Sequence, residues 1–169
     1  VGQSENERVV GGYDTYGQQI VSKVEFINST TAVAFGQKML SFYQVKEYPK
    51  LLADVSLDYE IKKIFYSDSY VGLVYMDDSN RNMIDVFNTS GEKTVTLEVP
   101  DGYINYAFAS SAVMMYGEES CRLVDCSGKG IFGYTFEDRI TALIPASGND
   151  RYVYITPGKI MVIKLKYGG

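Results

Sequence analysis

Two short acidic segments, each preceded by a tyrosine, hold the residues of this chain with the clearest chemical potential. They are Tyr75, Asp77, Asp78, Tyr116, Glu118 and Glu119. Carboxylates could bind a cation such as calcium or a basic partner, and tyrosine rings offer flat faces to a sugar or a peptide. No D-x-D-x-D-G spacing of a calcium loop is present. Polar hairpin tips and tyrosines packed between sheets explain the same residues and are the favoured interpretation, with a ligand-binding surface as the alternative.

The amino-acid composition excludes most of the catalytic and metal-binding sites to which such carboxylates could belong. The 169 residues contain no histidine, so a triad with an imidazole base, an H-E-x-x-H zinc helix and any histidine-ligated metal are impossible. The cysteines, Cys121 and Cys126, occupy odd and even positions of an apparent strand and would face opposite sides of a sheet. We therefore expect buried thiols rather than a disulfide or a metal site. No metal, cofactor or catalytic residue is predicted.

Charge and hydropathy limit the class of partner. The formal net charge of −5 leaves no basic face for a phosphate backbone, so no nucleic acid is expected to bind. No run approaches the roughly 20 apolar residues that cross a bilayer, so we expect no membrane insertion by this segment. With 46% hydrophobic and 22% charged residues, the chain is predicted to fold as one domain. It begins at Val1 rather than at Met, and we expect it to be a piece of something longer.

The elements that must position the acidic segments are β-strands. Apolar and polar residues alternate over most of the chain, which indicates an all-β protein. The pattern also repeats, because an apolar residue, two spacers and an apolar pair open a unit at Ile61, Ile104 and Ile140, with a weaker copy at Val21. The spacings of 40, 43 and 36 residues match a β-propeller blade, a four-stranded unit of about 40–45 residues.

The predicted organisation is an N-terminal segment, residues 1–19, followed by four β-propeller-type repeats at about 20–59, 60–102, 103–138 and 139–169. Each repeat is expected to form a four-stranded antiparallel sheet. Two third strands end in turn sequences, residues 88–91 and 125–128, where Asn88 or Asp125 can bond the turn backbone and a glycine tolerates positive φ. The acidic segments fall between second and third strands, in turns that converge on one face of a propeller.

The fourth repeat lacks a fourth strand in the sequence. The run from Arg8 to Tyr13 could pair there and close a complete small ring, a closure that protects sheet edges. Alternatively, the chain is an arc of a larger propeller, and its open sheet edges pair with further sequence or with a second copy as a homodimer. We favour the arc.

The turn sequences at residues 88–91 and 125–128 resemble those of bacterial propeller repeats whose third strand ends in Asp or Asn followed by Gly. The resemblance covers about residues 20–166, and the Gly-His and Trp-Asp signatures of WD repeats are absent. More narrowly, the chain is similar to an uncharacterised bacterial family of membrane-anchored, extracytoplasmic propeller-like proteins. This resemblance implies an extracytoplasmic or cell-surface location and assigns no function to any residue.

Two functions from different classes follow from these patterns. The favoured one is a non-catalytic binding module for a protein or a glycan, and its mark would be an exposed aromatic or acidic patch. The alternative is a fragment of a carbohydrate-active propeller enzyme, whose mark would be two carboxyl groups about 5–9.5 Å apart.

Overall fold

The computed structural model describes residues 21–146 and 150–165, which form four antiparallel sheets. Sheet 1 contains β1 (Val21–Asn28), β2 (Thr31–Gly36), β3 (Met39–Val45) and β4 (Pro49–Ser56). Sheet 2 contains β5 (Lys63–Tyr66), β6 (Tyr70–Met76), β7 (Asn82–Asn88) and β8 (Lys93–Glu98). Sheet 3 contains β9 (Asn105–Ala109), β10 (Ala112–Tyr116), β11 (Ser120–Asp125) and β12 (Ile131–Thr135). Sheet 4 contains β13 (Ala142–Pro145), β14 (Arg151–Ile155) and β15 (Ile160–Lys164).

Every sheet is a meander in which the strands pair in chain order. This arrangement confirms the predicted all-β, propeller-type fold with four repeats. Sheet 4 has three strands in the part of the chain that the structure describes, whereas the other sheets have four. The run from Arg8 to Tyr13, which we considered as a closing strand, lies outside the described residues. No described helix is long and apolar enough to span a membrane.

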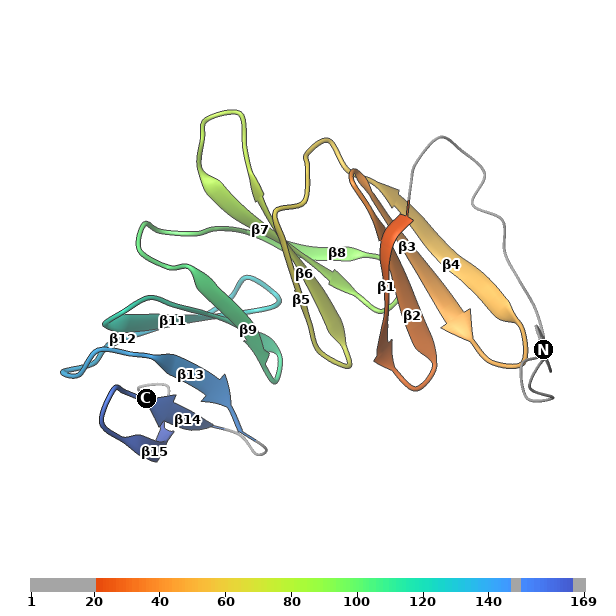
Figure 1. The fold of residues 1–169 in the computed structure, drawn as a ribbon. Helices are drawn as coiled ribbons and strands as arrows, with labels where there is room; N and C mark the ends of the chain where they lie inside the picture. The colour runs from red at the N-terminus through yellow and green to blue at the C-terminus, as the bar shows by residue number, and fades with distance from the viewer. Residues whose placement is uncertain (1–20, 147–149, 166–169) are drawn as a thin grey trace, which may run out of the picture.

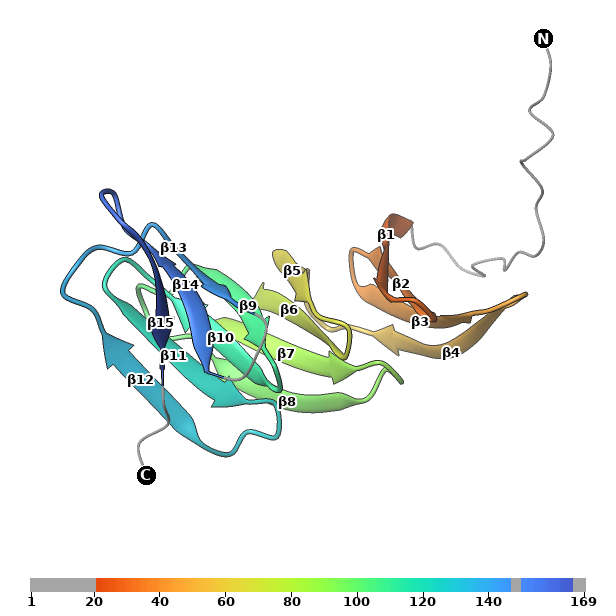
Figure 2. The same ribbon diagram turned by 90° about the horizontal axis from the view of Figure 1, so that it is seen from below.

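The sheets stand side by side in an open row rather than in a closed ring (Figures 1 and 2). The first strands of consecutive sheets are neighbours, since β9 lies beside both β5 and β13. Polar contacts link these inner strands, because the Tyr66 hydroxyl donates to Glu25 at 2.9 Å and Lys63 Nζ donates to the Ile104 carbonyl at 2.9 Å. Sheets 1 and 4 therefore occupy opposite ends of an arc.

In the part of the chain that the structure describes, the hydrophobic core forms three clusters, each between two neighbouring sheets. This division follows from strand alternation, because one face of a sheet packs against the preceding sheet and the other against the following one. The cluster between sheets 1 and 2 includes the fully buried Phe35 and Phe42. The cluster between sheets 2 and 3 includes Ile84 and Val86, and that between sheets 3 and 4 includes Leu123. Each inner sheet thus contributes to two cores.

The turns after β7 and β11 have the predicted chemistry. Asn88 Oδ1 accepts hydrogen bonds from the backbone N–H groups of Ser90 and Glu92, both at 3.0 Å, and Gly91 has a φ of 84°. Asp125 Oδ1 accepts one from the N–H of Ser127 at 2.7 Å. These side chains replace backbone partners within the turn, so the hairpins close where the sequence indicates.

The cysteines are buried and free, as predicted. Cys121 belongs to the cluster between sheets 3 and 4, whereas Cys126 belongs to the cluster between sheets 2 and 3, so they lie on opposite sides of one sheet. Burial raises the pKa of Cys121 to about 11 and that of Cys126 to about 12. Both therefore remain thiols at neutral pH and act as small apolar side chains.

Candidate functional site

The two acidic segments lie at the same end of two different sheets. One connects β6 to β7 and the other connects β10 to β11, the end at which each sheet is also joined to its neighbour. Their contacts, however, are local. Asp77 pairs with Arg81, whereas Glu118 pairs with Arg139, and no ion pair among the described residues joins one segment to the other.

Asp77 organises its own turn. Its Oδ1 accepts hydrogen bonds from the backbone N–H groups of Ser79 and Arg81, both at 2.9 Å, and its Oδ2 accepts one from Arg81 Nε at 2.9 Å. The hydrogen bonds from Arg81 are the main reason that the pKa of Asp77 is lowered. Asp78 is exposed at the tip of the same turn. The two neighbouring carboxylates therefore differ, because that of Asp77 accepts hydrogen bonds from the turn backbone and that of Asp78 points to solvent.

This difference predicts that Asp77→Ala lowers the midpoint of thermal unfolding at pH 7, while Asp78→Ala leaves it unchanged. The folded state lowers the pKa of Asp77 below its ordinary value of 3.8, so its contribution is present above that value and is lost as the pH falls through the folded pKa. Melting curves followed by circular dichroism at pH 7 and at pH 2 measure both effects. Equal melting of Asp77→Ala and the wild type at pH 7 would contradict this assignment.

Tyr75 belongs to a buried polar network rather than to the turn tip. Its ring stacks on Tyr59 with centroids 3.5 Å apart and planes 5° apart, and its hydroxyl donates to Asp85 at 3.4 Å. Burial raises the pKa of Tyr75 to about 12 and raises that of Tyr59 as well. One face of the Tyr75 ring is therefore covered by another tyrosine and is not free for a ligand.

Asp85 is the centre of this network, and the sequence analysis did not single it out. The side chain is 1% exposed, and it accepts hydrogen bonds from Tyr59 at 2.7 Å, from Thr96 at 2.5 Å and from Lys93 at 3.1 Å, besides Tyr75. A charged residue between apolar neighbours in a strand was the available signal, since buried carboxylates are almost always paired. The network joins three strands of sheet 2 to the connection from sheet 1.

Glu118 lies at the rim of a hollow of about 330 Å³ between sheets 3 and 4. Its carboxylate pairs with Arg139 at 2.5 Å across this rim. The hollow is lined by Ile104, Asn105, Gly117, Glu118, Arg139, Ile140, Thr141 and Pro157. Glu119 is exposed beside it, and Tyr116 is half-buried and packs against the cluster between sheets 3 and 4. The structure thus brings Glu118 to a hollow and leaves Glu119 in solvent.

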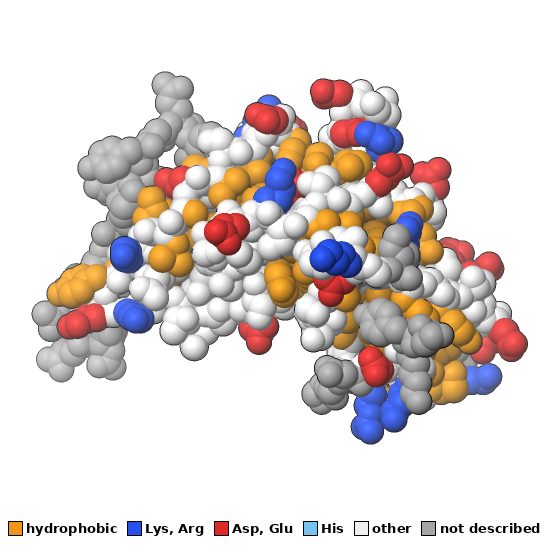
Figure 3. Space-filling model, turned by 180° about the vertical axis from the view of Figure 1, so that it is seen from behind, with side chains coloured by type: hydrophobic (Ala, Val, Ile, Leu, Met, Phe, Trp, Pro, Cys, Tyr) orange, Lys and Arg blue, Asp and Glu red, His pale blue; other side chains and the backbone are white. Residues whose placement is uncertain are grey.

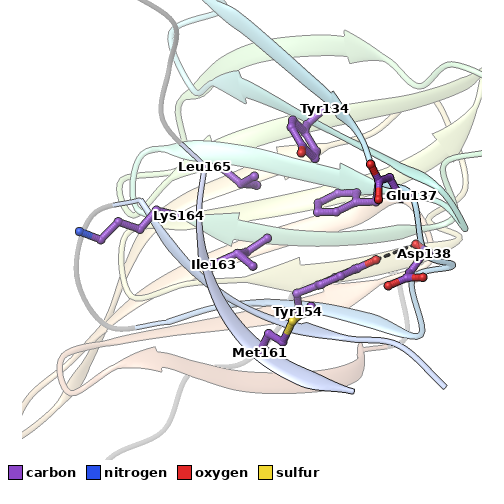
Figure 4. A pocket seen from close by; sticks show the side chains of 9 residues that line it. Tyr134, Glu137, Asp138, Tyr154, Met161, Ile163, Lys164 and Leu165 are labelled. Atoms are coloured by element: carbon purple, nitrogen blue, oxygen red, sulfur yellow. Dashed lines mark hydrogen bonds between the residues drawn. The ribbon is translucent and has the colours of Figure 1, made fainter. Parts of the chain in front are cut away.

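A larger hollow of about 450 Å³ lies farther out between the same two sheets (Figure 4). It is lined by Tyr134, Phe136, Glu137, Asp138, Tyr154, Met161, Ile163, Lys164 and Leu165. Phe136 stacks on Tyr154 with centroids 4.7 Å apart, and the Tyr154 hydroxyl donates to the Asp138 carbonyl at 2.6 Å. The hollow borders β15, the outermost described strand of sheet 4, and its aromatic lining was not predicted from the sequence.

The outer faces of the terminal sheets expose apolar side chains. On sheet 4, Ile160 and Val162 are 74% and 67% exposed, and on sheet 1 Phe26 is 63% exposed. Figure 3 shows hydrophobic side chains at the end of the molecule that sheet 4 forms. Phe26 lies on the face of sheet 1 away from sheet 2, because it stands opposite Ala32, whereas the next residue of β2, Val33, packs against sheet 2. Within the described ranges, no group of three or more Cys, Asp or Glu residues is suited to hold a metal ion.

The four meander sheets, with their inner strands side by side and their cores between sheets, define a β-propeller-type protein. The chain belongs to a family of unknown function, DUF5711, whose model matches residues 1–165. No curated protein matches the chain.

Solved β-propeller structures share the fold at low sequence identity. Hsv2 from Kluyveromyces lactis has a TM-score of 0.56 at 12% identity, over 90% of this chain and 48% of that one. BBS1N, in a complex with ARL6DN, has a TM-score of 0.55 at 6% identity, over 88% of this chain and 53% of that one. PorZ from Porphyromonas gingivalis has a TM-score of 0.52 at 15% identity, over 88% of this chain and 21% of that one. The chain spans about half the length of the first two structures.

Proposed function

We propose that the chain is a non-catalytic interaction module that binds protein through the apolar outer faces of sheets 1 and 4. The observation that carries this proposal is the exposure of Ile160 and Val162 on β15. Side chains at the equivalent positions of sheets 1, 2 and 3 are buried against a following sheet. These equivalents are Leu40 and Phe42, Ile84 and Val86, and Cys121 and Leu123.

The register of sheet 4 makes its exposed face continuous. Ile144 stands opposite Val153, and Val153 stands opposite Val162, while Ile155 stands opposite Ile160 in the adjacent row. Fully burying one such side chain contributes about 1.5–3 kcal/mol, so covering this face favours association. Monomeric proteins rarely leave large contiguous apolar patches in water, and such patches mark interaction sites.

The chemistry of the polar turns supports binding rather than catalysis. Asp77 is held by Arg81, Glu118 by Arg139, and Tyr75 by its stack on Tyr59. BBS1N, which has the same fold, is described in a complex with another protein. PorZ is described as a bacterial surface component, and an extracytoplasmic or cell-surface location in a bacterium is part of our proposal for this chain.

Self-association is the first expected consequence of these exposed faces. Light scattering on the wild-type chain should give a mass of about twice 18.9 kDa at micromolar concentration. Val162→Glu places a charge on the outer face of sheet 4 and should weaken dimerisation at least tenfold, since losing one buried valine costs about 1.5–3 kcal/mol. Ser111→Glu changes the net charge equally in an exposed turn, and should leave the dissociation constant unchanged.

A wild-type chain that stays monomeric over the whole concentration range would overturn the proposal that these faces bind a copy of the chain. Equal weakening by Val162→Glu and Ser111→Glu would show that net charge, and not the outer face of sheet 4, controls the association.

A further inference from the structure

The hollow of about 330 Å³ between sheets 3 and 4 combines an aliphatic wall with an ion pair. Its lining comes from the inner strand β9 and from turns and connections at one end of the two sheets. Ile104 is 60% exposed and Pro157 is exposed, so an apolar group that covered them would be stabilised. The volume lies near the lower end of the roughly 300–1,000 Å³ of ligand pockets, which suits a small molecule.

The walls of this hollow are fixed by backbone contacts. The Glu118 carbonyl accepts a hydrogen bond from the Ile140 N–H at 2.5 Å, which joins the turn of sheet 3 to the connection that leads into sheet 4. Gly117 packs directly against the preceding connection, because a Cβ at this position would collide with the Gly102 carbonyl oxygen. The hollow is therefore formed before any ligand enters it.

The ion pair at the rim retains unused hydrogen-bonding capacity at both ends. Arg139 Nη2 donates to Glu118 Oε1 at 2.5 Å, and within residues 21–146 and 150–165 this is the one hydrogen bond of either side chain. A guanidinium group has five N–H donors, and a carboxylate has about four acceptor positions. Both side chains are more than half exposed, so the pair contributes little to stability and can adjust to a ligand.

Two uncharged polar side chains also line the hollow. Asn105 lies on the side of β9 that faces sheet 4, because the next residue, Tyr106, packs against the cluster between sheets 2 and 3. Asn105 is half-buried and Thr141 is exposed, and neither side chain has a hydrogen-bond partner in the part of the chain that the structure describes. An amide both donates and accepts, so Asn105 can serve either charge of a ligand.

We propose that this hollow binds a free aliphatic α-amino acid. Such a ligand has a carboxylate and an ammonium group on one carbon, and it can lie beside the ion pair with the order of charges reversed. Arg139 then binds the carboxylate, Glu118 binds the ammonium group, and the aliphatic side chain covers Ile104. The inference goes beyond the proposed function, because the hollow lies at the inner ends of sheets 3 and 4 and not on an outer face.

The test is a nuclear magnetic resonance titration of the full ¹⁵N-labelled chain with L-leucine. The amide signals of Gly117, Glu118 and Thr141 should shift in a saturable way, with a dissociation constant of about 1 mM, because exposed charge pairs bind weakly. N-acetyl-L-leucine lacks the ammonium charge, L-leucinamide lacks the carboxylate, and glycine lacks the side chain. Each of the three should bind at least fivefold more weakly than leucine.

Matched substitutions assign each charge of the ligand to its residue. Glu118→Gln should bind leucine and N-acetyl-leucine equally, whereas Glu119→Gln, one position away with the same change in charge, should keep the wild-type preference. Arg139→Gln should bind leucine and leucinamide equally, and Arg81→Gln is its control, because Arg81 is exposed and pairs with Asp77 outside the hollow. Dispersed amide signals of each unbound variant verify that it is folded.

The analogues also decide whether the ligand is a free amino acid. Leucinamide that binds as tightly as leucine would identify the first residue of a peptide as the ligand, and equally tight N-acetyl-leucine would identify the last residue. Either result overturns the proposal, as does the absence of saturable shifts up to roughly tenfold above the expected dissociation constant. Shifts confined to other parts of the chain would overturn the site. A chain that stays monomeric in light scattering and binds leucine leaves this inference standing.

Discussion

Replacing Asp85 with alanine is expected to lower the free energy of unfolding by about 3–5 kcal/mol, because a buried carboxylate and its several hydrogen bonds are lost together. The carboxylate accepts hydrogen bonds from Tyr59, Thr96 and Lys93 between sheets 1 and 2. Without it, the hydroxyl groups of Tyr59 and Thr96 lose the acceptor that the fold provides. Domains are stable by only about 5–15 kcal/mol, so this variant should be close to unfolding.

Urea denaturation followed by circular dichroism measures this loss. Tyr75→Phe is the matched control, because it removes only the contact at 3.4 Å and retains the stack on Tyr59, and it should cost less than about 1 kcal/mol. Tyr59→Phe, which removes the contact at 2.7 Å, should fall between the two. If Asp85→Ala unfolds at the wild-type urea concentration, the network does not hold sheets 1 and 2 together.

Phe42→Ala should destabilise the chain by about 3–5 kcal/mol, the usual cost of truncating a buried phenylalanine. Phe42 is fully buried in the cluster between sheets 1 and 2, with its ring centroid 6.5 Å from that of Phe87. The packing is tight, because a methyl group added at Gly91 would lie 2.6 Å from the Ala53 Cβ and 3.0 Å from the Phe42 ring. A cavity at Phe42 therefore cannot be refilled without moving a turn of the neighbouring sheet.

Phe26→Ala provides the control for the Phe42 prediction within the same sheet. Phe26 is exposed on the opposite face, so its truncation should leave the unfolding of dilute, monomeric protein nearly unchanged while it weakens association. Urea midpoints at low protein concentration, compared with light scattering at high concentration, separate these effects. Equal destabilisation by both substitutions would show that the two faces of sheet 1 are not distinct in the way that the structure indicates.

The fold could be predicted from the sequence because the patterns that define its strands and turns are local and recur along the chain. Alternation of apolar residues defines each strand, and Asn88 and Asp125 with their following glycines define two of the turns. These signals act over a few residues, and their recurrence about every 40 residues specifies a propeller blade. Tertiary packing did not override them in any of the four sheets.

The polar network and the hollows could not be predicted in the same way, because they depend on contacts between distant segments. Asp85 meets Tyr59 across 26 residues, and Tyr154 meets Asp138 across 16. Nothing in the local pattern separates Tyr75, which is engaged in a stack, from a tyrosine that is free to bind a ligand. Asp77 and Asp78 also look alike in the sequence, and only the hydrogen bonds of the folded turn distinguish them.

Because the described residues form three hydrophobic clusters in series, the sheets need not open together. Among the described residues, sheets 2 and 3 each contribute to two hydrophobic clusters, whereas sheets 1 and 4 each contribute to one. In such a linear array, stability is close to a sum of nearest-neighbour terms, and local opening starts at the ends. Backbone amides of β13–β15 should therefore exchange with solvent deuterium sooner than those of β6, β7 and β10, and a partner bound at either end would slow this fraying.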